Sequence, residues 1–142
     1  MSDVVVDSSV VAKWFVPEPD SVQAERVVTD VRAAQGRLIV LDLVYSEVAN
    51  VIWKNYRRKT LTYTLAERAL AALMQTQMHA ESAKTLLNDA LKIAMQYDRA
   101  VYDSLFLVLA RSLGVRGVTA DEPLYNTTHA DFPEIILLRD WT

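Results

Sequence analysis

The chain has 142 residues, of which 51% are hydrophobic and 23% are charged, with only 3 Gly and 4 Pro; this predicts one soluble domain over residues 1–142 and excludes a disordered or low-complexity protein. It contains no Cys, which excludes a disulfide framework, a thiolate nucleophile and an iron–sulfur site. The net charge of −3 disfavours passive coating of nucleic acid, which depends on neutralising phosphates, but is compatible with a metal-dependent nuclease.

Short apolar runs alternate with stretches of helical periodicity along the chain. In chain order we expect strand 4–6, a short helix that ends before Pro17, helix 20–34, strand 38–41, helices 42–59, 65–78, 81–97 and 100–113, strand 115–119 interrupted by Gly117, a helical turn at 121–125 and strand 135–138. Ser8 or Ser9 is expected to cap the first helix, and Asp42 the helix after the second strand. This alternation predicts an α/β fold with a central parallel sheet flanked by helices on both faces.

No segment predicts a membrane helix or a signal peptide. Charged residues interrupt every early apolar run, and no run approaches the roughly 20 apolar residues that a membrane span needs. We therefore expect a cytoplasmic protein that does not associate with membranes.

Four acidic residues are expected near one edge of the sheet. Asp7 directly follows the first strand, and Asp121 follows the strand that ends at Thr119. Asp103 lies in the first turn of its helix, and Glu47 lies near the start of another. Because ligands of open α/β sheets bind at the carboxyl ends of the strands, we expect these carboxylates to converge there.

Each acid alone would be an ordinary cap or turn residue, but the four together indicate a site. Neighbouring carboxylates repel, and no Lys or Arg lies close to Asp7 or Asp121 in the sequence to neutralise them. A hard divalent cation such as Mg²⁺, which prefers oxygen ligands, would relieve the repulsion. It would also lower the pKa of a bound water and bind a phosphate oxygen.

The segments that carry these acids resemble the signature of PIN domains. They are 4–9 (VVVDSS), 46–51 (SEVANV), 101–105 (VYDSL) and 118–124 (VTADEPL). The order and spacing of the segments match over nearly the whole chain, most closely the VapC toxin nucleases of VapBC toxin–antitoxin pairs. The resemblance implies a PIN-like fold, a Mg²⁺- or Mn²⁺-dependent endoribonuclease, a homodimer and inhibition by a cognate antitoxin protein.

The same resemblance implies roles for individual residues. Asp7, Glu47, Asp103 and Asp121 match the catalytic acids, and Thr119 matches a supporting polar position. Asp7, Asp103 and Asp121 would hold the metal, with Glu47 completing the site. The implied reaction is in-line attack on an RNA phosphodiester by metal-activated water, giving 5′-phosphate and 3′-hydroxyl ends.

A dense basic run continues the helix that carries Glu47. It consists of Lys54, Arg57, Arg58 and Lys59. One interpretation is an RNA-binding patch beside the acids, which would offset the net negative charge. The other is a solvated helix end, where cations favour the helix dipole.

Two other function classes stay open at this point. The segment 38–43 (LIVLDL) resembles a phospho-receiver strand ending in a phosphoacceptor, Asp42, although the acidic pair after the first strand and the Lys after the last are missing. A dehalogenase-type phosphatase is disfavoured, because Ser9 stands where its second Asp belongs. A non-catalytic binding module would have no affinity for divalent metals.

Overall fold

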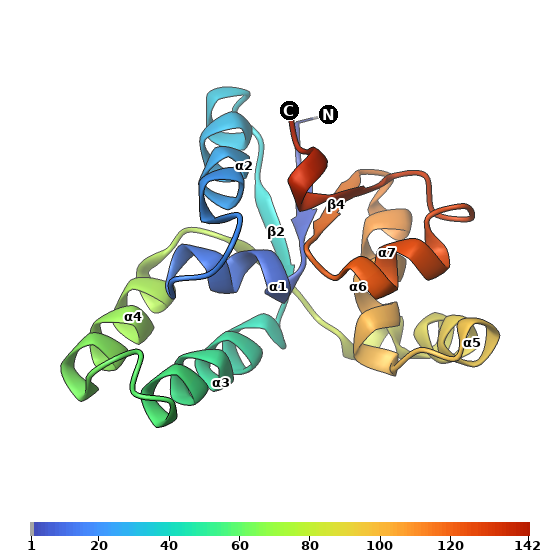
Figure 1. The fold of residues 1–142 in the computed structure, drawn as a ribbon. Coiled ribbons are helices and arrows are strands. Elements are labelled where there is room, and N and C mark those ends of the chain that lie inside the picture. The colour runs from blue at the N-terminus through green and yellow to red at the C-terminus, as the bar shows by residue number, and fades with distance from the viewer. Residues whose placement is uncertain (1) are drawn as a thin grey trace.

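A computed structural model describes residues 2–142 and shows a five-stranded sheet with helices on both sides (Figure 1). The strands are Val4–Val6 (β1), Leu38–Leu41 (β2), His79–Glu81 (β3), Arg116–Thr119 (β4) and Ile135–Leu137 (β5). All four strand pairs are parallel, in the order β3-β2-β1-β4-β5. The predicted α/β fold with a central parallel sheet is confirmed.

Seven α-helices connect and cover the strands. They are Ser8–Val11 (α1), Ser21–Ala33 (α2), Val44–Arg57 (α3), Tyr63–Gln75 (α4), Leu87–Tyr97 (α5), Val101–Leu113 (α6) and Glu122–Thr128 (α7). Figure 1 shows α1 and α2 on one side of the sheet and α5 and α6 on the other. Among residues 2–142, no helix combines the length and apolar character needed to cross a membrane.

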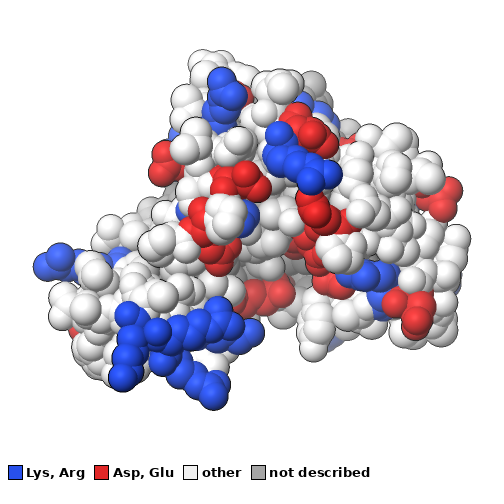
Figure 2. Space-filling view, viewed as in Figure 1, with Lys and Arg blue, Asp and Glu red and all other residues white. Residues whose placement is uncertain are grey.

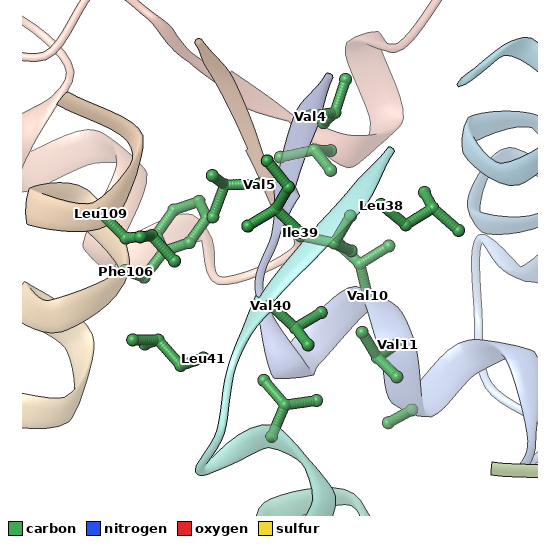
Figure 3. Packing of buried hydrophobic residues seen from close by; sticks show 14 of the residues in the cluster. Val4, Val5, Val10, Val11, Leu38, Ile39, Val40, Leu41, Phe106 and Leu109 are labelled. Atoms are coloured by element: carbon green, nitrogen blue, oxygen red, sulfur yellow. The ribbon is translucent and has the colours of Figure 1, made fainter. Parts of the chain in front are cut away.

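The core lies on both faces of the central strands, which explains why those strands are uniformly apolar rather than alternating. Val4, Val5 and Val6 of β1 are at most 1% exposed. In Figure 3, Phe106 and Leu109 of α6 lie on one side of β1 and β2, and Val10 and Val11 of α1 lie on the other. Burying each such side chain contributes about 1.5–3 kcal/mol, so the carboxyl end of β1 is held firmly from both sides.

Gly117 does not interrupt the fourth strand, contrary to the expectation. Strand β4 runs unbroken through this residue, which lies opposite Val5 in the parallel register. A Cβ atom at Gly117 would lie 2.8 Å from Ile135 Cδ1 and 3.0 Å from Phe106 Cζ. Glycine here leaves room for Ile135 of β5 and Phe106 of α6 to pack closely, and it does not break the strand.

The expectation for residues 76–86 is also corrected. Helix α4 ends at Gln75 and α5 begins only at Leu87, and between them lie strand β3 and a 3-10 turn at Lys84–Leu86. His79 and Ala80 of β3 are exposed. An exposed edge strand of three residues has no apolar pattern that would distinguish it from a helix end.

Two predicted helix caps are wrong. The N-cap of α1 is Asp7, and neither Ser8 nor Ser9 takes that position. The N-cap of α3 is Leu43. Asp42 instead accepts a hydrogen bond from the Ala83 backbone N at 3.2 Å, so it ties the end of β2 to the segment after β3.

Candidate active site

The two central strands, β1 and β4, mark the point where the direction of the sheet reverses. From β1 the chain continues to β2 on one side, whereas from β4 it continues to β5 on the other. Asp7 directly follows β1, and Asp121 lies two residues after the end of β4. Such a switch point leaves a crevice at the carboxyl ends of the strands, where ligands of open α/β sheets bind.

All four predicted acids line one pocket of about 420 Å³ at this point. Asp7 and Asp121 come from the strand ends, Glu47 from the first turn of α3, and Asp103 from the first turn of α6. Exposed Tyr102 also borders the pocket. The structure therefore brings together side chains that are up to 114 positions apart in the chain, from Asp7 to Asp121.

Two hydroxyl groups hold the carboxylate of Asp7. Ser9 Oγ donates to Asp7 Oδ2 at 2.7 Å, and Thr119 Oγ1 donates to the same oxygen at 2.8 Å. Ser9 Oγ accepts from the Ala120 backbone N at 3.0 Å, and Thr119 Oγ1 accepts from the Asp121 backbone N at 3.1 Å. Each hydroxyl thus donates to Asp7 and accepts from the backbone, and this network joins the ends of β1 and β4.

Asp121 is fixed by a helix and Asp103 by an arginine. Asp121 is the N-cap of α7, and its Oδ1 accepts from the Leu124 backbone N at 3.0 Å. Arg99 Nη2 lies 3.3 Å from Asp103 Oδ2 and 3.8 Å from Asp121 Oδ2.

The absence of a basic residue close to Asp7 or Asp121 in the sequence does not leave the acids without a counter-charge in the fold. Arg99 is 22 positions before Asp121 in the chain, and only the fold brings the two together. Lys13 also lines the pocket, where its Nζ lies 3.2 Å from Glu18 Oε1 and its side chain is 10% exposed.

Burial and mutual repulsion raise the pKa of three of the four acids. Burial is the largest cause for Asp7, opposed by the hydrogen bonds from Ser9 and Thr119. Burial also raises the pKa of Glu47, and the charge of Asp7 adds to the effect. For Asp103, burial and the charge of Asp121 together outweigh the lowering effect of Arg99. A negative charge on these three side chains is therefore unfavourable in the folded chain.

The side chains of the pocket include the type of ligand that binds a hard cation, but they do not surround a single point. Among the residues that the structure describes, no three His, Cys, Asp or Glu side chains form a group that could hold a metal ion as they stand. The pocket nevertheless offers several carboxylate oxygens, which are ligands that Mg²⁺ and Mn²⁺ prefer. The unrelieved negative charge at Asp7, Glu47 and Asp103 favours a cation there.

The basic run forms a surface patch next to the pocket. We call Lys54, Arg57, Arg58 and Lys59 the basic patch; all four are exposed. Figure 2 shows these blue side chains gathered over α3, on the same face as red side chains nearer the centre. Lys54 itself lines the pocket, so the patch and the acids are continuous.

Sequence reasoning missed Arg99, Lys13 and the role of Ser9. The signal for Arg99 was its spacing of four from Asp103, which places the two side chains on one side of the chain at the start of α6. The contact of Arg99 with Asp121 depends on how α6 packs beside β4, and the Ser9–Thr119 network depends on the pairing of β1 with β4. No local pattern encodes either of them.

Comparisons with known proteins identify a family and a similar fold. The family model of the PIN domain matches residues 4–130. The chain is 36% identical over 123 residues to Ribonuclease VapC3 of Pyrobaculum aerophilum, an alignment that covers 85% of this chain and 91% of the relative. Its fold is similar to the crystal structure of PAE2754 from Pyrobaculum aerophilum, with a TM-score of 0.69 at 20% identity, over 96% of this chain and 91% of that one.

Proposed function

The chain belongs to the PIN domain family, and on this premise we propose that it is a metal-dependent endoribonuclease, the toxin of a type II toxin–antitoxin pair, acting in the cytoplasm. The observation that carries the proposal is the single pocket lined by Asp7, Glu47, Asp103 and Asp121 at the switch point of the sheet. The similarity to a protein named Ribonuclease VapC3 supports RNA as the substrate.

The proposed cofactor is Mg²⁺ or Mn²⁺, held by Asp7, Asp103 and Asp121 with Glu47 nearby. Both side-chain hydrogen bonds to Asp7 reach its Oδ2 atom. No donor among residues 2–142 hydrogen-bonds to its Oδ1 atom, so this oxygen is available to bind a cation. A bound divalent cation supplies positive charge for the scissile phosphate and lowers the pKa of a water molecule.

The side chains of the protein hold the reacting groups in place. Ser9 and Thr119 fix Asp7, and their hydrogen bonds favour its ionised form. Glu47 has a raised pKa, which makes it a stronger base than an ordinary carboxylate and suits it to accept a proton during hydrolysis. We assign these positions to the catalytic machinery as a proposal.

The basic patch is proposed to bind the RNA backbone. Its four cations can neutralise phosphates that would otherwise be repelled by the acids. Arg57 lies over the ring of Trp53, with its Cζ 5.4 Å from the ring centroid, so aromatic and cationic groups face solvent together. Because hydrolysis by this route does not use the 2′-hydroxyl, preference for RNA must come from shape and contacts.

The apolar surface of the helices supports two protein partners, a second copy of the chain and an antitoxin. Leu87, Leu91 and Met95 lie at intervals of four on α5 and are exposed. Such an apolar stripe suits packing against the equivalent helix of a second copy across a twofold axis.

A groove of about 310 Å³ between α3 and α4 is lined by Trp53 and Tyr63 among others. We propose that the groove receives apolar side chains of the antitoxin.

A cleavage assay with two Asp→Asn variants tests the proposed activity. Asp103 lines the pocket, whereas Asp42 lies at the same edge of the sheet but accepts from Ala83 N. We expect Asp103→Asn to lose at least about 100-fold in the rate of Mg²⁺-dependent RNA cleavage, and Asp42→Asn to retain activity. The opposite pattern would favour the receiver-like alternative, and cleavage by neither the wild type nor Asp42→Asn would refute the nuclease.

A further inference from the structure

Arg99 stands between α5 and α6 and neutralises part of the acidic pocket. Among residues 2–142, it is the only side chain that forms ion pairs with the four acids, and it contacts two of them. Its backbone N donates to the Ala94 carbonyl at 3.1 Å, so the base of the side chain is anchored at the end of α5.

The fit of the guanidinium to these acids is poor. One nitrogen, Nη2, serves both carboxylates, and its distance to Asp121 is 3.8 Å. The Nε atom of Arg99 is buried and has no hydrogen-bond partner. A second arginine in the same chain shows the contrast, because Arg37 donates from both Nε and Nη2 to Asp3 Oδ2, at 3.1 and 3.0 Å.

An arginine that positions a carboxylate usually donates two parallel hydrogen bonds to it from two nitrogens, which fixes the geometry. Arg99 makes no such pair of hydrogen bonds, so its interaction with Asp103 and Asp121 depends on charge rather than on geometry. Charge is also what a divalent cation would bring to the same two acids, so the two positive charges compete for the same carboxylates.

We infer that Arg99 is the internal counter-ion of the pocket: it stabilises the fold when no divalent cation is bound, and it weakens the binding of that cation. The inference rests on the proposed function, and it adds a regulatory residue to it. Arg99 would set the cation concentration at which the pocket fills, and hence the concentration at which the nuclease becomes active.

The electrostatics support this role. Arg99 brings one positive charge to two carboxylates, so it neutralises them only in part and a divalent cation can still bind there. At a separation of roughly 6 Å in water, repulsion between a single and a double positive charge corresponds to about a tenfold loss of affinity.

Calorimetric titration with Mn²⁺ on the whole protein tests the inference. We expect Arg99→Gln to bind Mn²⁺ about tenfold more tightly than the wild type, and to melt at a lower temperature in EDTA because Asp103 and Asp121 then repel each other unopposed. Arg99→Lys is the matched control, since it keeps the charge without the fork, and its Mn²⁺ affinity is expected to equal that of the wild type.

The possible results separate the two proposals. If the wild type binds Mn²⁺ and Arg99→Gln binds it equally or more weakly, the counter-ion role is wrong while the nuclease proposal stands. If neither protein binds Mn²⁺, both are overturned. If Arg99→Gln fails to fold, the NMR resonance of the Arg99 Nε–H group in the wild type provides a second test. This resonance is assigned by its absence from the spectrum of Arg99→Lys, and we expect it to shift during a Mg²⁺ titration. An unchanged resonance would overturn the inference.

Discussion

A carboxylate at the end of a fully buried strand is costly to a folded protein, and Asp7 occupies that position. Ser9 and Thr119 offset part of the cost through hydrogen bonds, yet burial still raises the pKa of Asp7. A residue kept under such conditions is a candidate for function, because an Asn of the same shape would suit the fold better.

Asp7→Asn should therefore stabilise the protein in EDTA while removing its RNA cleavage. The Asn oxygen can still accept from Ser9 and Thr119, and the buried charge is gone. We expect the melting temperature to rise by roughly 2–6 °C at about pH 8, as measured by differential scanning calorimetry.

The stability that Asp7→Asn gains over the wild type should depend on pH, and the raised pKa of Asp7 determines in which direction. Because the pKa of Asp7 is higher in the folded chain than in the unfolded chain, the folded protein keeps this proton to a higher pH. The wild type therefore loses stability as the pH rises from the ordinary carboxyl range through the raised pKa. The difference between Asp7→Asn and the wild type should shrink toward about pH 4, and a difference that is constant with pH would contradict this explanation.

The four acids could be predicted from the sequence because each follows a strand or opens a helix, where position alone determines the edge of the sheet at which it lies. Arg99 could not, because its contact with Asp121 depends on how α6 packs beside β4. Thr119 was identified only through the family resemblance. The structure shows that the Thr119 hydroxyl is buried and links Asp7 to the Asp121 backbone.

At the scale of elements, α3 connects the acidic pocket with the basic patch. Its first turn carries Glu47, and its last turn carries Lys54, which lines the pocket, and Arg57. A single helix therefore fixes the distance between the proposed catalytic centre and the proposed RNA track.

Replacing both arginines of the basic patch should change RNA binding and leave cation affinity unchanged. We expect Arg57→Ala with Arg58→Ala to weaken RNA binding and to reduce the slope of log K against log salt by about 1.4–1.8, as expected for two lost phosphate contacts. Calorimetric Mn²⁺ binding should not change. A binding constant and slope equal to those of the wild type would mean that the patch is only a solvated helix end.

Elements with an apolar pattern were predictable, and β3 was not. The strands β1 and β2 are buried on both faces, so their sequences are continuous apolar runs. Strand β3 is held by backbone pairing to β2 at the edge of the sheet. Two of its three side chains are exposed, so its own sequence does not indicate a strand.

At the scale of the whole molecule, exposed apolar side chains gather on particular helices. Among residues 2–142, twelve large hydrophobic residues are exposed, and three of them follow one another on α5. Contiguous apolar surface of this kind is typical of protein interfaces, which is why we expect a homodimer.

Light scattering at micromolar concentration should show a dimer of the 16.0 kDa chain. Leu91→Lys with Met95→Lys should shift it to the monomer, because paired helices would then bury like charges. Leu70→Lys, in the groove between α3 and α4, is the matched control and should remain dimeric. A wild type that is monomeric, or a dimer that survives the α5 changes, would contradict the proposed interface.

The central claim is that the four acids form one cation-dependent site, and a melting series of the wild type and Asp103→Asn, in EDTA and in Mn²⁺, tests it most directly. In EDTA the variant should melt at or above the wild-type temperature, because it loses a carboxylate with a raised pKa while Arg99 keeps Asp121 as a partner. At a Mn²⁺ concentration about 100 times the dissociation constant, the wild type should gain about 2.7 kcal/mol of stability, and Asp103→Asn should gain much less. Equal stabilisation of the two proteins by Mn²⁺ would contradict the account.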